Sequence, residues 1–324
     1  MRILVLGGTG FLSGAVVAEA LSRSHELTTV TRGRRGEPPA SVTSLHADRG
    51  SVEELGRAAA GLALDAVIDT SGYTVDGARA AAQVFRGARS YAFVSSISAY
   101  RDWPPGPVLS ESDPTFPSDA DLTDYGPMKA ESERVLASAL GDALLVARAG
   151  LIIGRGDRTR RLTSWLHRIA TQERVVVPAH LEQPIAFIDV RDLAAFLVDA
   201  VERGLSGPVN ATGPAAMTTF GGMLDACRAA VSALGGRPAE LVPVDEDQLI
   251  QAGIEPWVHL PFWLPHSVAT TAWEVGTSRA RELGVPTRPV EDSVLDAWRW
   301  VQETGFEHER HPGADIEDKL LAEV

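Results

Sequence analysis

Tyr125 and Lys129 are the residues whose types and spacing most directly indicate chemistry. They stand in the segment DYGPMKAESE, residues 124–133, in a chain with only 4 tyrosines and two lysines. A tyrosine followed four positions later by a lysine is expected by chance roughly 0.02 times in such a chain. A phenol titrates at about pH 10, and a nearby ammonium favours its phenolate form. The pair is therefore suited to exchanging a proton with a carbonyl or alcohol oxygen as a general acid and base.

A helix is needed to bring these two side chains together. Asp124 can cap a helix, and Pro127 is tolerated within its first turn. The segment therefore predicts a helix that runs to Leu140, with Tyr125 and Lys129 on one face about one turn apart. The alternative is a helix start that contains both residue types without any chemistry.

A serine hydroxyl could polarise the same substrate oxygen. The segment YAFVSSISAY places Ser96 at the carboxyl end of a predicted strand, and ligands of open α/β sheets bind at that edge. Ser95 and Ser98 are competing candidates. These serines could instead only cap the turn.

A glycine-rich turn follows the first predicted strand. LVLGGTGFLSG has Gly7, Gly10 and Ser13 in the spacing G-x-x-G-x-x-S, with Ser13 where a third glycine is usual. Glycines allow the backbone to approach a pyrophosphate, and the following helix start offers amide groups. The turn predicts nucleotide binding, and the alternative is a left-handed turn with no ligand. The expected contacts are Gly7, Thr9, Gly10, Phe11 and Leu12.

Basic residues follow the second predicted strand, where the choice between two nicotinamide cofactors is usually made. TVTRGRRG carries Arg32, Arg34 and Arg35 and no carboxylate. Guanidinium groups suit a 2'-phosphate, which favours NADP(H) and leaves NAD(H) as a second option. A solvated basic loop is the alternative. After a third strand, LHADRG places Asp48 and Arg49 where a carboxylate could bind the adenine amino group.

Short apolar runs alternate with alanine-rich segments through the first half of the chain. This pattern predicts an α/β fold, a doubly wound parallel sheet of the Rossmann type with a smaller, interleaved C-terminal substrate lobe. The proline-rich, acidic stretch 101–122 predicts a surface loop near a site. Predicted strands cover 1–8, 25–32, 64–72, 90–96 and 142–153, with strand-like segments at 184–190 and 207–213. Predicted helices cover 15–24, 51–61, 76–88, 131–140, 193–204 and 220–234. The expected domains are residues 1–153 plus about 184–213 for the dinucleotide, about 154–183 and 214–305 for the substrate, and 306–324 as a C-terminal tail.

Composition narrows the classes of partner. The 324 residues carry a net charge of -13, which argues against a general affinity for nucleic acids or anionic membranes. The apolar run ILVL is too short for a signal peptide or a spanning helix, and Cys227 is the only cysteine, so we expect a cytoplasmic protein without an intramolecular disulfide. The eight histidines show no metal-site spacing. The nearest approach is HERH, residues 308–311, so no metal is expected.

Taken together, these motifs resemble the extended short-chain dehydrogenase/reductase superfamily, in its NAD-dependent epimerase/dehydratase branch. GGTGFLSG, SSISAY, YGPMK, RAGLIIGRGD, FIDVRDLA and VNATGP follow in the expected order. The resemblance implies that Ser96 is the catalytic serine, Tyr125 the acid/base and Lys129 its partner, which also binds the cofactor. It further implies that Thr70, Ser71 and Gly72 line the cofactor. Ser13 and Ala149 depart from the usual glycine and proline, and VIDTSGY, SSISAYRD, YGPMK and the tail GADIEDKLLAEV look closer to bacterial reductase-like members.

The leading interpretation is an NAD(P)H-dependent ketoreductase that acts on a small-molecule carbonyl or alcohol. A first alternative is an epimerase or dehydratase of a sugar nucleotide. A second is a non-catalytic relative that senses cofactor or binds RNA, for which RTRR, residues 158–161, is the one basic cluster. We expect a small-molecule partner and allow a homodimer. Candidate substrate residues are Tyr73, Ser98, Arg158, Trp165 and Phe187, although aromatic residues are more often core.

Overall fold

The computed structural model describes residues 1–34, 36–306 and 311–323. These residues form two compact units. Unit 1 comprises Met1–Ile152, Val190–Gly213 and Val275–Thr287, and unit 2 comprises Ile153–Asp189, Pro214–Glu274 and Arg288–Val324. The chain therefore crosses repeatedly between units, as the interleaved pattern of the sequence suggested.

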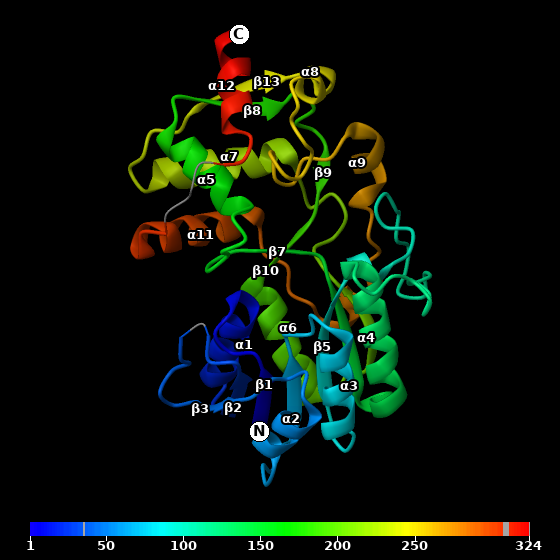
Figure 1. Cartoon of the computed structure of the whole chain (residues 1–324). Coiled ribbons are helices and arrows are strands. Elements are labelled where there is room, and N and C mark those ends of the chain that lie inside the picture. The colour runs from blue at the N-terminus through cyan, green and yellow to red at the C-terminus, as the bar shows by residue number, and fades with distance from the viewer. Residues whose placement is uncertain (35, 307–310, 324) are drawn as a thin grey trace. The chain divides into compact units, whose positions relative to one another are not determined.

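Unit 1 is built on a parallel sheet of seven strands in the order β11-β6-β5-β4-β1-β2-β3 (Figure 1). Its strands are rich in apolar and β-branched residues, and β1, β4, β5 and β6 are almost completely buried, as strands covered on both faces must be. The bounds are β1 Arg2–Leu6, β2 Glu26–Thr31, β3 Thr43–His46, β4 Ala66–Asp69, β5 Tyr91–Ser96, β6 Leu144–Ala149 and β11 Gly207–Ala211.

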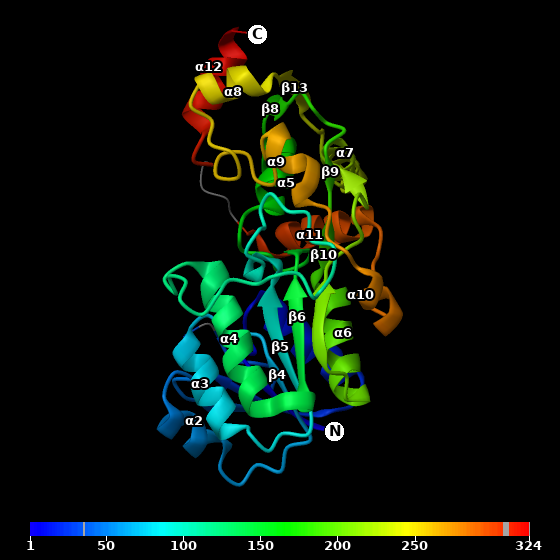
Figure 2. The same cartoon turned by 90° about the vertical axis from the view of Figure 1, so that its right-hand side faces the viewer.

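Helices cover both faces of this sheet (Figure 2). Helices α1 (Phe11–Ser22) and α6 (Val190–Arg203) pack together on one face, and α2 (Val52–Ala59), α3 (Val75–Val84) and α4 (Tyr125–Leu140) lie side by side on the other. Short helices are η1 Ile97–Ala99, η2 Gly141–Ala143 and α10 Ser278–Leu283. The predicted doubly wound α/β fold is confirmed.

The predicted strand 142–153 is in fact two strands, β6 and β7 (Leu151–Ile153), separated by Gly150. A Cβ on Gly150 would lie 2.1 Å from the Thr212 hydroxyl oxygen, so only glycine fits there. Stretch 101–122 contains no helix or strand, as its prolines predict.

Unit 2 has a helical core with short strands around it. Helix α7 packs against α5 and α11, β8 and β13 pair in parallel, β9 and β12 pair in antiparallel, and α12 packs on β8. The bounds are α5 Leu162–Thr171, β8 Arg174–Pro178, β9 Pro184–Ile185, β10 Phe187–Asp189, β12 Thr218–Thr219, α7 Phe220–Ala233, β13 Glu240–Val244, α8 Glu246–Gln251, α9 His266–Ala272, α11 Val290–Thr304 and α12 Ala314–Glu323.

Three boundaries differ from the domains expected from the sequence. Residues 184–189 group with unit 2, because β9 pairs with β12 of that unit. Residues 275–287 group with unit 1, because α10 packs on β11 and Val275 bridges to Val108. The described part of the expected tail 306–324 is no separate segment, since α12 packs on β8 within unit 2.

Candidate active site

The three residues predicted to be catalytic all lie in unit 1, on β5 and α4. Ser96 is the last residue of β5, Tyr125 is the first residue of α4, and Lys129 lies one turn further along that helix. Gly126 allows this helix start to approach η1, because a Cβ there would lie 2.3 Å from the Ser98 carbonyl oxygen. Asp124 occupies the N-cap position with extended backbone, but its side chain makes no capping hydrogen bond, so close packing fixes the helix start.

Lys129 is buried among aromatic rings. Its side-chain nitrogen Nζ donates a hydrogen bond to the Val94 carbonyl oxygen at 3.0 Å and lies 5.6 Å from the centre of the Tyr125 ring. The Tyr73 and Phe93 rings are 5.1 and 5.2 Å from the same nitrogen. Burial lowers the pKa of Lys129 to about 8. Tyr125 itself is 47% exposed, so this ring stands between a buried cation and the surface.

The serine candidates have different surroundings. Ser96 Oγ accepts a hydrogen bond from the Ser98 backbone nitrogen and donates one to Ser98 Oγ, each at 3.1 Å. It therefore caps η1, as the structural alternative proposed, and it lies at the sheet edge beside the start of α4. Ser95 donates to the buried carboxylate of Glu133 at 2.5 Å and faces the protein interior. Ser95 is thereby separated from the other two candidates.

The glycine turn has the backbone that a pyrophosphate requires. Gly7 and Gly8 have φ values of +110° and +153°, and a Cβ on Gly7 would lie 2.6 Å from the Thr70 hydroxyl oxygen. Helix α1 begins at Phe11, so the first amide groups of this helix, Phe11 and Leu12 among them, have no helical carbonyl to bond. Ser13, in the place of the usual glycine, accepts a hydrogen bond from the Gly10 backbone nitrogen at 2.8 Å and closes the turn. These residues fit a dinucleotide, with amide donors and a helix dipole at one point.

The candidate cofactor residues that follow β2 and β3 differ in their contacts. Arg32 and Arg34 are exposed, and neither forms an ion pair with a described residue; Arg35 lies outside the described residues. The Asp48 carboxylate accepts a hydrogen bond from the Gly50 backbone nitrogen at 2.9 Å.

Arg49 is largely buried, and its predicted contact with the cofactor stays a prediction. Its guanidinium makes two hydrogen bonds to Asp69, at 2.5 and 2.7 Å, and one to Ser71 Oγ at 2.8 Å. The charge-assisted hydrogen bonds to the buried Asp69 carboxylate hold the Arg49 guanidinium in the interior. Sequence reasoning missed Asp69, although an acidic residue at the end of the apolar run AVID was a visible signal.

The loop after β4 packs tightly against its neighbours. Thr70 Oγ1 donates to the Leu6 carbonyl oxygen at 3.0 Å, and a Cβ on Gly72 would lie 2.3 Å from the Phe93 ring. Thr70, Ser71 and Gly72 therefore hold the loop against β1 and β5, next to the glycine turn. Their contact with a cofactor stays a prediction.

The substrate candidates are scattered. Tyr73 is 67% exposed beside Lys129, and Ser98 is half-buried next to Ser96. Arg158, in unit 2, is exposed with its guanidinium 5.7 Å from the centre of the Phe306 ring. Trp165 and Phe187 are buried in the core of unit 2, where the Trp165 indole donates to the Pro261 carbonyl oxygen at 2.8 Å, and their contact with a substrate stays a prediction. Their apolar surface is used for packing, as aromatic side chains most often are.

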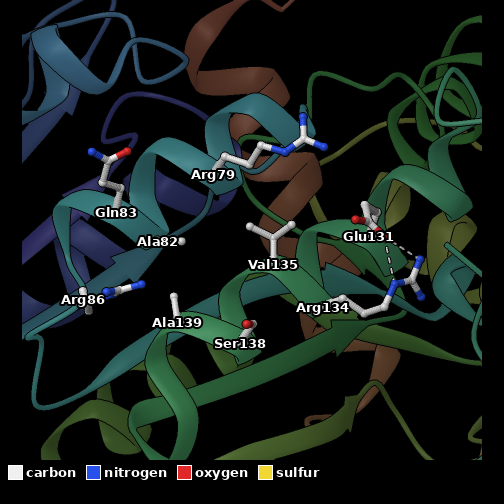
Figure 3. Close-up of a pocket in the computed structure, with 9 residues that line it drawn as sticks. All are labelled: Arg79, Ala82, Gln83, Arg86, Glu131, Arg134, Val135, Ser138 and Ala139. Carbon is white, nitrogen blue, oxygen red and sulfur yellow. Dashed lines mark hydrogen bonds and ion pairs between the residues drawn. The ribbon is translucent and has the colours of Figure 1, made fainter.

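A groove of about 720 Å³ lies elsewhere on unit 1, between α3 and α4. Figure 3 shows its arginines, Arg79, Arg86 and Arg134, with Arg134 paired to Glu131. Ser96, Tyr125 and Lys129 are not among its lining residues. We locate the candidate active site by its chemistry and not by this groove, because the one carboxylate that lines the groove, Glu131, is paired with Arg134.

The described residues offer neither a metal site nor a membrane span. No group of three or more His, Cys, Asp or Glu residues is arranged to hold a metal ion there, and His308 of the HERH segment lies outside the described part. Within the same residues, no helix combines the length and apolarity that a membrane span requires.

Comparison with known proteins identifies the relatives of this chain. Residues 3–212 match the model of the NAD dependent epimerase/dehydratase family. No curated protein sequence matches the chain. Among solved structures, the Bordetella bronchiseptica enzyme WbmH, in complex with NAD+, is 16% identical over 94% of this chain and 99% of its own, with a TM-score of 0.70.

Two UDP-glucose 4-epimerases are similar in the same way. The enzyme of Thermotoga maritima, solved with UDP-glucose, is 16% identical over 94% of this chain and all of its own, with a TM-score of 0.69. The enzyme of Thermus thermophilus, solved with NAD, is 18% identical over 93% and 99% of the two chains, with a TM-score of 0.66. At such identities the likeness shows a common fold and nothing finer.

Proposed function

Because this chain belongs to the NAD dependent epimerase/dehydratase family, we propose that it is an NAD(P)-dependent oxidoreductase in which Tyr125 gives or takes the substrate proton. The observation that carries the proposal is the position of Tyr125, half exposed at the start of α4 and 5.6 Å from the buried Lys129 ammonium. A positive charge beside the ring favours the phenolate over the phenol, and the phenolate is the form that accepts a proton.

Three side chains have separate roles in this proposal. Tyr125 exchanges the proton with the substrate oxygen, and Ser96 or its neighbour Ser98 donates a hydrogen bond to the same oxygen. Lys129 holds the positive charge near Tyr125, and its burial strengthens that interaction by excluding water. For the net reaction we propose reduction of a small-molecule carbonyl.

The dinucleotide would be held by the glycine turn, through the backbone of Gly7, Thr9, Gly10, Phe11 and Leu12. When bound, the nicotinamide ring supplies or accepts the hydride. We propose NADP(H) as the preferred cofactor, because Arg32 and Arg34 are exposed directly after β2 and no carboxylate replaces them there. NAD(H) is the second candidate, favoured by the family name and by the NAD in two similar structures.

Tyr73 is the best-supported substrate contact. Its exposed ring lies near Lys129 in the same unit as Ser96 and Tyr125. An exposed aromatic face beside the reacting groups suits a substrate with a flat or apolar ring next to its carbonyl.

A second candidate function is the epimerisation or dehydration of a sugar nucleotide. The specific observation that favours it is the similarity to two UDP-glucose 4-epimerases over nearly the full length of both chains. Such an enzyme oxidises its substrate and then reduces it again, so the cofactor is regenerated within each turnover.

The test is to incubate the purified protein with NADPH or NADH and a panel of aromatic and aliphatic carbonyls, and separately with UDP-glucose and a trace of NAD. Our proposal predicts that NADPH is oxidised in proportion to the alcohol formed from at least one carbonyl. Conversion of UDP-glucose without net cofactor oxidation would replace it by the second candidate. Tight cofactor binding without turnover in either assay would favour a non-catalytic relative.

A further inference from the structure

Two buried carboxylates flank Lys129, and each already has an arginine of its own. Asp69 lies at the end of β4, in register with Phe93, whose ring is 5.2 Å from Lys129 Nζ. Glu133 lies one helical turn beyond Lys129 on α4. Both carboxylates attract the ammonium electrostatically, but the hydrogen bond of Lys129 goes to the Val94 carbonyl oxygen.

The carboxylate of Asp69 is fully occupied by other donors. Arg49 donates to both of its oxygens, Tyr91 Oη donates to Oδ2 at 2.8 Å, and the Ser71 backbone nitrogen donates to Oδ1 at 3.1 Å. Asp69 is completely buried, and the side chain of Arg49 is 15% exposed. Ser71 Oγ adds a longer hydrogen bond to Oδ1 at 3.5 Å, and a buried carboxylate with five donors has little capacity left for another.

Glu133 is occupied in the same way. Arg148 Nη2 donates to Oε2 at 2.8 Å, Arg148 Nε lies 3.2 Å from both oxygens, and Ser95 donates to Oε1 at 2.5 Å. The Arg148 guanidinium also donates to the Tyr100 hydroxyl at 2.9 Å. Two arginines thus neutralise the two carboxylates that would otherwise bind the lysine.

We propose that Arg49 and Asp69 are positioning residues for Lys129: by occupying Asp69, Arg49 prevents a Lys129–Asp69 ion pair and leaves the ammonium on the Val94 carbonyl oxygen, 5.6 Å from the centre of the Tyr125 ring. If Asp69 lost its arginine, its buried carboxylate would be left without a cation, and we expect it to pair with Lys129, which it already attracts electrostatically. The ammonium would then be held by Asp69, and the carboxylate would offset the positive charge that Tyr125 now experiences. The role of this arrangement in catalysis rests on the proposed function, but the effect of Arg49 and Asp69 on the Lys129 ammonium does not.

The sign of the effect follows from the groups around Lys129. These are Tyr125 and Glu133 on α4, Asp69 on β4, Tyr73 in the next loop, and Arg49 behind Asp69. Burial is the largest influence and lowers the pKa of Lys129, Asp69 raises it, Arg49 lowers it, and Glu133 raises it. Removing Arg49 alone should therefore raise the pKa of Lys129, and removing the charge of Asp69 alone should lower it further.

The experiment uses the fact that the chain has two lysines, Lys129 and Lys319. The full-length protein is produced with lysine carrying ¹³C at its ε carbon, and both resonances are followed by NMR as the pH is raised. Lys319 is exposed in α12 of unit 2 and serves as an internal control. The variants are Arg49→Gln, Asp69→Asn and the double variant that carries both changes.

We expect Arg49→Gln to raise the pKa of Lys129 by about one pH unit and Asp69→Asn to lower it by a similar amount. The double variant, which replaces the ion pair by a neutral amide pair, should return the pKa to within a few tenths of a unit of the wild type. Lys319 should titrate unchanged in all of them. Shifts of the same sign in both single variants, or no shift in either, would overturn the proposal, because a merely structural role gives no reason for opposite signs.

Folding and function are controlled separately. If Arg49→Gln does not fold, Asp69→Asn still tests the sign of the shift in the Lys129 pKa, and the double variant still tests its return to the wild-type value. Arg49→Lys, which keeps the positive charge at this position, can then replace Arg49→Gln as the control. Where turnover is measurable, the pH limb of kcat should move in the same direction as the NMR titration. A wild-type protein without turnover would remove the proposed function and leave the NMR result valid.

Discussion

Lys129 carries a charge that the protein solvates only in part. The residue is 3% exposed, and its ammonium is offset by a carbonyl dipole and three aromatic rings. Aromatic faces attract cations, but they replace hydration incompletely. This incomplete replacement of water by protein groups lowers the pKa of Lys129. The same lack of water leaves the charge of Lys129 weakly screened, so that it acts more strongly on Tyr125.

Replacing Lys129 by Met should therefore stabilise the protein without cofactor. The pKa of Lys129 is about 8 in the folded state against an ordinary value of 10.5, so the unfolded chain binds the proton more tightly. The stability penalty is complete below about pH 8 and disappears as the pH rises toward 10.5. At pH 7 the free energy of unfolding of Lys129→Met should exceed that of the wild type by about 1–3 kcal/mol.

Urea unfolding at several pH values measures this difference. The gap between variant and wild type should narrow steadily above pH 8, while Lys319→Met, an exposed change in α12, should show no such trend. A variant that is less stable at pH 7, or a gap independent of pH, would contradict the account of Lys129.

At this scale the sequence predicts residues that are close in the chain far better than those that are distant. Tyr125 and Lys129 are four positions apart on one helix, so helical geometry alone brings them together. The ion pair of Arg49 and Asp69 was not predicted, because the two residues are 20 positions apart and their pairing depends on how the loop after β3 meets the end of β4. Long-range ion pairs of this kind leave almost no local signal.

Element by element, the sheet and the helices of unit 1 follow the sequence pattern closely. Apolar runs became buried strands, and alanine-rich segments became the covering helices. The predicted strand 142–153 leaves the main sheet after Ala149 and continues as β7, which pairs with β10 instead. Gly150, between the two strands, has no room for a side chain because Thr212, just after β11, occupies that space. In unit 2 the predicted strand-like segment 184–190 contains β9 and β10, whereas β8, β12 and β13 were not predicted. Strand β12 has only two residues, too few to show a periodicity.

The loop after β2 is the element that should decide between the two nicotinamide cofactors. Arg32 follows the end of β2 and is exposed, where a guanidinium can meet a 2'-phosphate. We expect NADPH to raise the Tm of the wild type more than NADH does, and Arg32→Ala to lose most of that difference. Arg57→Ala, on α2, is a suitable control because this exposed arginine pairs with Glu53 of the same helix.

Differential scanning fluorimetry with matched concentrations of the two cofactors gives the answer. Equal stabilisation by both, or a larger effect of NADH on the wild type, would contradict NADP(H) preference and return the choice to NAD(H).

At the scale of the whole molecule, the sequence correctly indicated that the two units are interleaved. Some of the predicted positions at which the chain crosses from one unit to the other were wrong. Residues 275–287 return to unit 1 through α10, a helix too short to show a pattern that would assign it. The C-terminal helix α12 is tied into unit 2 by Glu317, which accepts hydrogen bonds from Arg168 at 2.5 Å and from the Val176 backbone nitrogen at 2.7 Å. The cytoplasmic location and the homodimer stay predictions.

The central claim about the molecule is that Tyr125 is its acid/base. The most direct test is the turnover of Tyr125→Phe on a carbonyl that the wild type reduces, together with its affinity for the cofactor. Tyr73→Phe, which removes the other exposed phenol near Lys129, should lose far less activity. We predict that Tyr125→Phe lowers kcat by about 10²-fold or more with cofactor affinity within a few-fold of the wild type. A variant that turns over at the wild-type rate would contradict the account.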